Sequence, residues 1–387
     1  MNRLKIYSIL SHLFTALVTA FTIFYFVLVF NVDISVKDFF YDADTPRTLQ
    51  YVNEPSSAIS SIRPFLFLIS WIPNLFLEIF KPYIAWSILN LICIFVQIAC
   101  IKHVFREIHI PLPYLSFIVA NFSVLCWTFV PDTFIIGVTF FLLGVVLYGD
   151  GSNNLRITLS GIIAASLNIF LFVPWIIAHI LLGRKTLFKS LSRMIPAHVV
   201  VTTMIFSSQY LQRFTPRVLS VDLQDSIHKI EPSRNLPFYD QSGIFASVDA
   251  LGWIHSPFIG TAKNLLSFFS APWTQAYSYD SNTWAIDSDF HPFLMLFLAL
   301  ALTLLSFAGI YLMKNEYRVF MSFIFSLEIA TCLLFLTYGT HPYLYAPFLF
   351  VSRISGLIFF VRRYEIAFIP LILISATLAI TSLQFIP

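Results

Sequence analysis

The chain has 387 residues, of which 58% are hydrophobic and only 11% are charged, and its mean hydropathy is +0.81. Soluble domains carry about 25% charged residues, so this composition excludes an ordinary water-soluble globule and predicts a multi-span membrane protein. The apolar mass, which includes 43 Phe residues, also excludes collagen-like and disordered chains. The net charge of +3 is small and is spread over short segments, which argues against nucleic acid as a partner.

Apolar runs long enough to cross a membrane as helices occur about eleven times, so the predicted fold is an all-α polytopic membrane protein. The first run, 6–30, is too long for the apolar part of a signal peptide and lacks a small-residue cleavage site, so we expect it to be a retained span. The other predicted spans are 84–101, 112–130, 133–148, 157–170, 171–182, 195–211, 292–313, 319–337, 344–360 and 366–384.

The run 64–80 is predicted to lie along the outer membrane surface, because Pro64, Pro73 and Glu78 suit an interfacial helix better than a span. With this placement every basic cluster falls on the cytoplasmic side, as the positive-inside rule requires, and the N-terminus is cytoplasmic. These clusters hold more than half of the 23 Lys and Arg residues: Arg3/Lys5, Lys102/Arg106, Arg156, Arg184/Lys185/Lys189/Arg193, Lys314/Arg318 and Arg362/Arg363.

The predicted spans divide the chain into three regions. An N-terminal transmembrane module, 1–211, includes the first outer loop, 31–63, and the interfacial helix, 64–80. The outer loop 212–291 follows; at about 80 residues it is too small for an enzyme domain with its own core. Its apolar stretch 258–269 is predicted to be a second interfacial helix. The C-terminal transmembrane helices occupy 292–387.

Most of the 20 acidic residues fall on the outer side in this topology, which is where we expect chemistry. Asp42 and Asp44 stand in the segment YDADTPR (41–47) soon after the first span, near the interface, where a low dielectric strengthens electrostatic interactions. Taken singly, each is most simply a solvated loop carboxylate. Arg47 is placed to pair with Asp44 or to bind a phosphate through two hydrogen bonds.

Asp132 stands in the tight outer turn predicted between the spans 112–130 and 133–148. Its simplest role is to cap the N-terminus of the second of these helices. A carboxylate fixed at a helix start is also well oriented for chemistry, so the structural and functional roles are compatible.

Two arginines on the outer side of this topology differ in their setting. Arg63 opens the interfacial run, where a lone Arg most often contacts lipid headgroups. Arg353 falls inside the span 344–360, and an intramembrane Arg marks a site or cavity by default. The alternative is a structural ion pair with Glu328, which lies inside the preceding span. Three further polar side chains gather in the outer turn before Arg353: His341, Tyr343 and Tyr345.

Several motifs that would indicate other chemistry are missing from the sequence. No HxxxH or HExxH spacing occurs, so we predict no histidine metal site, and no Walker loop, GxSxG or GxGxxG opens a helix. Asn168 and His179 are predicted to be polar helix-packing groups. The four cysteines stand in apolar runs without paired spacing and are predicted to be small buried hydrophobic residues: Cys93, Cys100, Cys126 and Cys332.

The order of these features resembles the GT-C superfamily of integral membrane glycosyltransferases, which take a sugar from a polyprenyl-phosphate donor. Protein O-mannosyltransferases and lipid A aminoarabinose transferases belong to this superfamily. The resemblance covers the first two hundred residues well and the rest loosely. It rests on the acidic first outer loop, the interfacial run from Arg63-Pro64, the span ending in Lys102 and Arg106, the outer turn with Asp132 and the basic inner loop 184–193.

The resemblance implies an inverting transfer of a sugar to a glycan or glycolipid acceptor, on the outer face of a bacterial cytoplasmic membrane whose lipids surround the protein. Asp44 is the expected general base, with Asp42 as its rival, and Asp132 orients the acceptor or the base. Whether Mg²⁺ or Mn²⁺ takes part stays open. The expected substrate-binding residues are Arg47, Arg63 and Arg353 at the phosphate, with His341, Tyr343 and Tyr345 beside them.

Two other functions stay open on the sequence. A transporter or flippase of lipid-linked sugars would be favoured by ionisable residues deep in many spans. In this chain such residues are few, and Glu328 and Arg353 are the ones that stand out. An O-antigen-type polymerase would place its chemistry on the loop 212–291, which carries Arg213, Arg217 and Arg234. A purely structural membrane subunit would leave the acids of the first loop unexplained.

Overall fold

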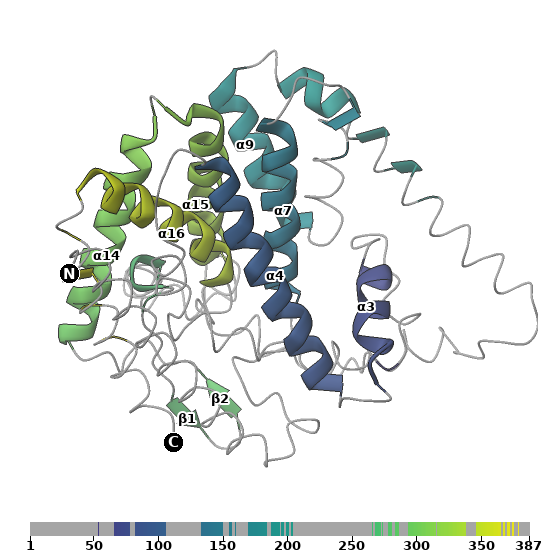
Figure 1. The fold of residues 1–387 in the computed structure, drawn as a ribbon, viewed down its shortest axis with the longest axis horizontal. Coiled ribbons are helices and arrows are strands. Elements are labelled where there is room, and N and C mark those ends of the chain that lie inside the picture. The colour runs from purple at the N-terminus through teal and green to yellow at the C-terminus, as the bar shows by residue number, and fades with distance from the viewer. Residues whose placement is uncertain are drawn as a thin grey trace, which may run out of the picture.

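The computed structural model describes the chain in separate stretches (Figure 1). The described part is mostly α-helical, as predicted, with a small antiparallel hairpin of β1 (Ser278–Asp280) and β2 (Thr283–Ala285). The described stretches are residues 66–77, 82–105, 133–149, 169–183, 187–193, 268–271, 273, 278–280, 283–285, 293–314, 316–337 and 346–364. A few isolated positions elsewhere are also described.

Six of the predicted spans and the predicted interfacial run are present as helices. The five other predicted spans lie wholly or largely outside the described residues, so the total of about eleven stays a prediction. The described helices are α3 (Leu66–Asn74), α4 (Pro82–Val104), α7 (Phe134–Gly149), α9 (Phe172–Leu182) after the 3-10 turn η2 (Ile169–Leu171), α14 (Phe293–Leu312), α15 (Arg318–Thr337) and α16 (Ala346–Arg363).

One described helical stretch, Ile84–Val104 within α4, is long and apolar enough to cross a membrane by its length and composition. Shorter apolar helices are Phe134–Gly149, Phe172–Leu182 and Leu296–Leu312. A buried core helix of a soluble protein would meet the same criterion, so the exposure of the helix faces matters. Phe95 of α4 is 62% exposed and Leu304 of α14 is 64% exposed, so large apolar side chains point outward from both helices.

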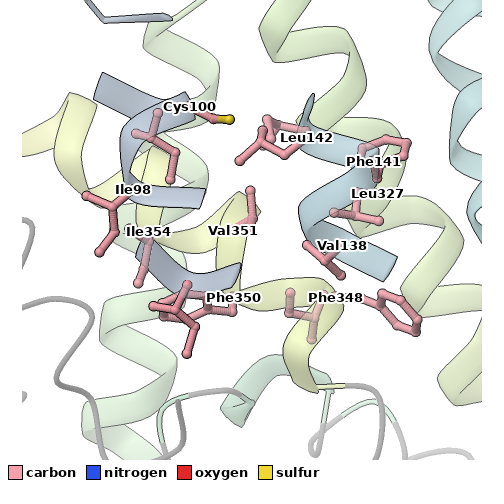
Figure 2. Packing of buried hydrophobic residues seen from close by; sticks show 14 of the residues in the cluster. Ile98, Cys100, Val138, Phe141, Leu142, Leu327, Phe348, Phe350, Val351 and Ile354 are labelled. Atoms are coloured by element: carbon pink, nitrogen blue, oxygen red, sulfur yellow. The ribbon is translucent and has the colours of Figure 1, made fainter. Parts of the chain in front are cut away.

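The helix α16 lies at the centre of the described bundle. It is buried along almost its whole length and packs against α14, α15 and α7, while α15 also packs against α9 and α4 packs against α7 (Figure 1). Figure 2 shows the interior that results, where Ile98 of α4, Leu142 of α7 and Val351 of α16 belong to one apolar cluster. The sequence produces this core because these helices carry bulky aliphatic and aromatic residues at every turn.

A buried polar link joins α4 to α7. The side-chain amide of Gln97 donates to Thr139 Oγ1 at 2.8 Å and to the carbonyl oxygen of Ile135 at 3.2 Å. The Thr139 hydroxyl donates to the same carbonyl, at 2.8 Å. Both side chains are almost fully buried, so the hydrogen bonds fix the two helices relative to each other in an otherwise apolar contact.

We expect Thr139→Val to destabilise the protein by about 1 kcal/mol, because it removes the hydroxyl that accepts from Gln97 and leaves that amide with one partner fewer. Valine has nearly the same shape, so packing changes little. The measurement is the midpoint of thermal unfolding in detergent micelles. A midpoint equal to that of the wild type would show that the Gln97 amide contributes nothing through Thr139.

Two glycines lie where α14 and α16 are in close contact. A Cβ atom added to Gly309 would collide with the carbonyl oxygen of Gly356, and one added to Gly356 would collide with the carbonyl oxygen of Ser306. The Ser306 hydroxyl donates to the backbone carbonyl of Arg353 at 2.9 Å. Small residues therefore let these two backbones touch, as at many interfaces between transmembrane helices.

Candidate functional site

One of the predicted site residues, Arg353, lies within the described residues, near the middle of α16. Its neighbours are Glu328 near the middle of α15 and Thr303 near the middle of α14. The remaining predicted site residues lie outside the described part of the chain: Asp42, Asp44, Asp132, Arg47, Arg63, His341, Tyr343 and Tyr345.

Arg353 forms a side-on, two-point ion pair with Glu328. Its Nε donates to Glu328 Oε1 at 3.2 Å and its Nη2 donates to Oε2 at 3.3 Å. The hydroxyl of Ser352 donates to Glu328 Oε1 and also to the carbonyl oxygen of Leu349. The side chains of Arg353 and Glu328 are 0% and 3% exposed, so this pair is enclosed within the bundle. The predicted structural pairing is confirmed.

The third nitrogen of the guanidinium holds a segment of the chain that is distant in sequence. Arg353 Nη1 donates to the carbonyl oxygen of Phe269 at 3.2 Å, to that of Ala271, and to Thr303 Oγ1 at 3.1 Å. The carbon of the guanidinium also lies 4.8 Å from the ring centre of Phe268. Opposite charge, carbonyl oxygens and an aromatic face together satisfy the cation in a place where water does not reach it.

This geometry changes two predictions. Arg353 was expected among the phosphate ligands, but its nitrogens already have partners and its side chain is fully buried, so it fastens helices and is not available to a substrate. The stretch 258–269 was expected on the membrane surface, but its end is enclosed, because Phe268 is 4% exposed and packs beside Arg353. Thr303 was not predicted from the sequence, although the spacing of small residues along α14 was an available signal.

Three basic segments meet at one end of the bundle, called here the basic end (Figure 1). Phe105, just after α4, packs edge-on against Tyr317 with 5.1 Å between ring centres and lies 5.8 Å from Phe359 of α16. Arg362 Nη1 donates to Glu316 Oε2 at 3.0 Å. The basic end therefore gathers Lys102, Lys314, Arg318, Arg362 and Arg363, all of them predicted to be cytoplasmic.

The helices α7, α9 and α16 begin together at the opposite end. Phe134, the first residue of α7, packs edge-on against Phe348 in the first turn of α16, with 5.2 Å between ring centres. Phe170, in the turn before α9, lies 5.1 Å from the same ring. In the sequence Asp132 precedes Phe134 by two positions, and Tyr345 directly precedes α16. Candidate residues from two distant segments thus adjoin helix starts that lie side by side.

The start of α7 differs by one residue from the prediction. The amide of Gly137 donates to the carbonyl oxygen of Thr133 at 2.8 Å, and the helix begins at Phe134. Thr133 therefore occupies the position before the helix that was predicted for Asp132. Asp132 itself lies outside the described residues.

His179 packs in an aromatic cluster, as predicted for a polar helix-packing group. Its ring lies 5.1 Å from Tyr148, 5.6 Å from Trp175 and 5.7 Å from Phe323. Cys93 and Cys100 are buried free thiols, as predicted, whereas Cys332 is only partly buried, and Cys126 lies outside the described residues. Among the described residues there is no group of three or more His, Cys, Asp or Glu side chains that could hold a metal ion.

No protein-family model, no curated protein and no solved structure matches the chain.

Proposed function

We propose that the chain is a multi-span membrane glycosyltransferase of the GT-C type, which moves a sugar from a polyprenyl-phosphate donor to a glycan or glycolipid acceptor. The supporting observation is the polarity of the bundle. Basic side chains gather at one end, and the helix starts next to Asp132 and Tyr345 gather at the other. In a bacterial cytoplasmic membrane the positive-inside rule assigns the basic end to the cytoplasm, so the opposite end faces outward.

The distribution of apolar and polar side chains supports a lipid environment. Phe297 of α14 is 61% exposed, and Leu91 and Ile92 of α4 are also exposed, so both helices present apolar side chains outward. Thr303 of α14 and Asn90 of α4 are instead buried between helices. A hydrocarbon solvent favours this arrangement, in which apolar side chains face away from the bundle and hydrogen-bonding side chains lie between the helices.

In the proposed reaction an acceptor hydroxyl or amine attacks the anomeric carbon of the donor sugar. Asp44 takes the acceptor proton as general base, while the bond from the anomeric carbon to the polyprenyl phosphate breaks and the phosphate leaves with the electron pair. Arg47 and Arg63 stabilise the negative charge that develops on the leaving phosphate. Asp132 orients the acceptor or the base, and Asp42 is the rival base. The sugar is transferred with inversion because a single displacement occurs.

A transport function would draw support from ionisable side chains that line a path through the bundle. Glu328 and Arg353 do not line such a path, because they bind each other and are enclosed. The described residues therefore favour neither a transporter nor a flippase, and both become outcomes of the experiment that follows.

The experiment compares surface glycans by mass spectrometry from cells that carry the wild type, Asp42→Asn, Asp44→Asn, Asp132→Asn or no protein. We expect the wild type to add one sugar residue. We expect Asp44→Asn to lower the amount of that product at least about a hundredfold, because an amide cannot act as general base. Asp132→Asn should give a smaller loss, since it changes only orientation. The amount of folded protein must be equal for each variant.

Asp150→Asn is the matched control. Asp150 directly follows α7, in the segment before Arg156 that the predicted topology places in the cytoplasm. Asp132 precedes the same helix, so the control makes the same charge change at its other end. Its glycans should equal those of the wild type. If the added sugar persists in Asp42→Asn, Asp44→Asn and Asp132→Asn alike, the carboxylates are bystanders and the transporter or polymerase alternative replaces this proposal.

A further inference from the structure

Residues 268–271 and 273 belong to the predicted outer loop 212–291, yet they lie beside the middles of α14 and α16. Ala271 is 0% exposed, and Trp273 is 1% exposed and donates its indole N–H to Thr303 Oγ1 at 2.9 Å. Thr303 lies ten residues after Phe293, the first residue of α14, which at 1.5 Å per residue is about 15 Å along the helix. Arg353 lies seven residues into α16, about 10 Å from its start.

We propose that residues 268–271 and 273 belong to a re-entrant segment, which leaves the outer surface, reaches the middle of the membrane-spanning bundle and is held there by Arg353. This inference rests on the proposed membrane placement of the helices, but it does not depend on glycosyl transfer. Arg353 acts in it as a positioning residue and touches no substrate.

The backbone of such a segment needs a hydrogen-bond donor for each carbonyl oxygen, because the hydrocarbon layer supplies none. The carbonyl of Phe269 accepts from Thr303 Oγ1 at 2.6 Å and from Arg353, and the carbonyl of Ala271 also accepts from Arg353. The carbonyl of Ser270 accepts from the backbone N–H of Trp273 at 3.0 Å. Three successive carbonyls at the end of a helical turn are thus satisfied at mid-depth of α14.

An arginine side chain is well suited to hold the carbonyl oxygens of this segment. Carbonyl oxygens at the end of a helical turn carry partial negative charge and attract a cation. An unpaired cation would be costly in the membrane interior, but Glu328 neutralises Arg353 through two of its nitrogens and leaves the third for the segment. A lysine ammonium lacks the planar guanidinium group with its three nitrogens, so it cannot donate hydrogen bonds to the carboxylate and to both carbonyls in the same way.

The test is the labelling rate of Ser270→Cys by a membrane-impermeant maleimide, in the full chain in membranes. Serine and cysteine have similar shapes, so the substitution is a small change. Ser270 is 1% exposed, so the thiol at this position is shielded in the folded protein. The four native cysteines are replaced with alanine. We expect labelling at no more than about a tenth of the rate measured after unfolding in SDS, because only local opening exposes the thiol. Labelling at the SDS rate would overturn the re-entrant placement.

Two variants test whether the polar network holds the segment. Thr303→Val removes the hydroxyl that contacts Phe269 and Trp273, and Arg353→Lys removes the guanidinium group, so each should raise the labelling rate about tenfold or more. Arg362→Gln removes an arginine ion pair at the basic end and should leave the rate unchanged. Gel filtration must show that each variant is folded. If the rate stays low in both Thr303→Val and Arg353→Lys, the anchoring role is wrong.

The two proposals fail separately. Labelling needs neither the sugar donor nor the acceptor glycan. A shielded Ser270→Cys, found together with glycans that are the same with and without the protein, contradicts the glycosyltransferase proposal alone. A fully reactive Ser270→Cys in cells where Asp44→Asn abolishes sugar transfer contradicts the re-entrant segment alone.

Discussion

Replacing Glu328 with alanine is expected to destabilise the protein by about 3–5 kcal/mol, because it leaves a cation enclosed in the bundle without its counterion. Arg353 is fully buried, and Glu328 accepts from two of its nitrogens and from Ser352. The measurement is the midpoint of thermal unfolding in detergent micelles, with the yield of monodisperse protein as a second readout.

The control for this prediction is the ion pair at the basic end. Glu316→Ala removes the partner of Arg362, but these side chains are 53% and 29% exposed, so water replaces the lost contact. We expect a cost of at most about 1 kcal/mol. If Glu328→Ala and Glu316→Ala lower the unfolding midpoint equally, the buried pair does not contribute in the way described here.

The double variant Glu328→Leu/Arg353→Met separates the two tasks of the arginine. Removing both charges while keeping apolar volume should recover part of the stability lost in Glu328→Ala, since no charge remains buried. The recovery should be incomplete, because the carbonyls of Phe269 and Ala271 then lack the donor that Arg353 supplies. The unrecovered part includes what the contact with residues 268–271 contributes to stability, together with the lost hydrogen bonds to Ser352 and Thr303.

The sequence predicts where the described helices lie, because each coincides with an apolar run and most of the runs are separated by charged or Pro-containing segments. The gathering of basic residues at one end is consistent with the predicted orientation of the same helices, from Lys102 to Arg363. The close packing of α14 against α16 was not predictable. Gly309 and Gly356 are two of the 12 glycines, and one sequence does not say which small residues face each other.

The candidate site, too, was predictable from the sequence only in part. Two opposite charges inside consecutive predicted spans must either pair or line a cavity, so the contact between Glu328 and Arg353 was one of two stated alternatives. The contact between Arg353 and Phe269 joins residues 84 positions apart, and it is made to a backbone carbonyl, which leaves no trace in residue identity. The roles of Asp42, Asp44 and Asp132 stay predictions that rest on the order of residues in the sequence.

Gly356→Ala is expected to cost about 3 kcal/mol or more, although alanine favours helices over glycine by up to about 1 kcal/mol where there is room. At Gly356 there is no room, because the new Cβ would lie 3.0 Å from the Cα atom of Ser306 and still closer to its carbonyl group. The obstacle is backbone, so no side chain can turn away, and α14 and α16 must separate. Their separation breaks the bond from Ser306 to the Arg353 carbonyl.

Gly149→Ala is the matched control, since Gly149 ends α7 and a Cβ atom there meets nothing within 4 Å. Its unfolding midpoint should equal or slightly exceed that of the wild type, the opposite sign to Gly356→Ala. Gly309→Ala should resemble Gly356→Ala, and the double variant should cost less than the sum of the two, because the first substitution already separates the helices. Additive costs, or a neutral Gly356→Ala, would show that α14 and α16 are not in backbone contact.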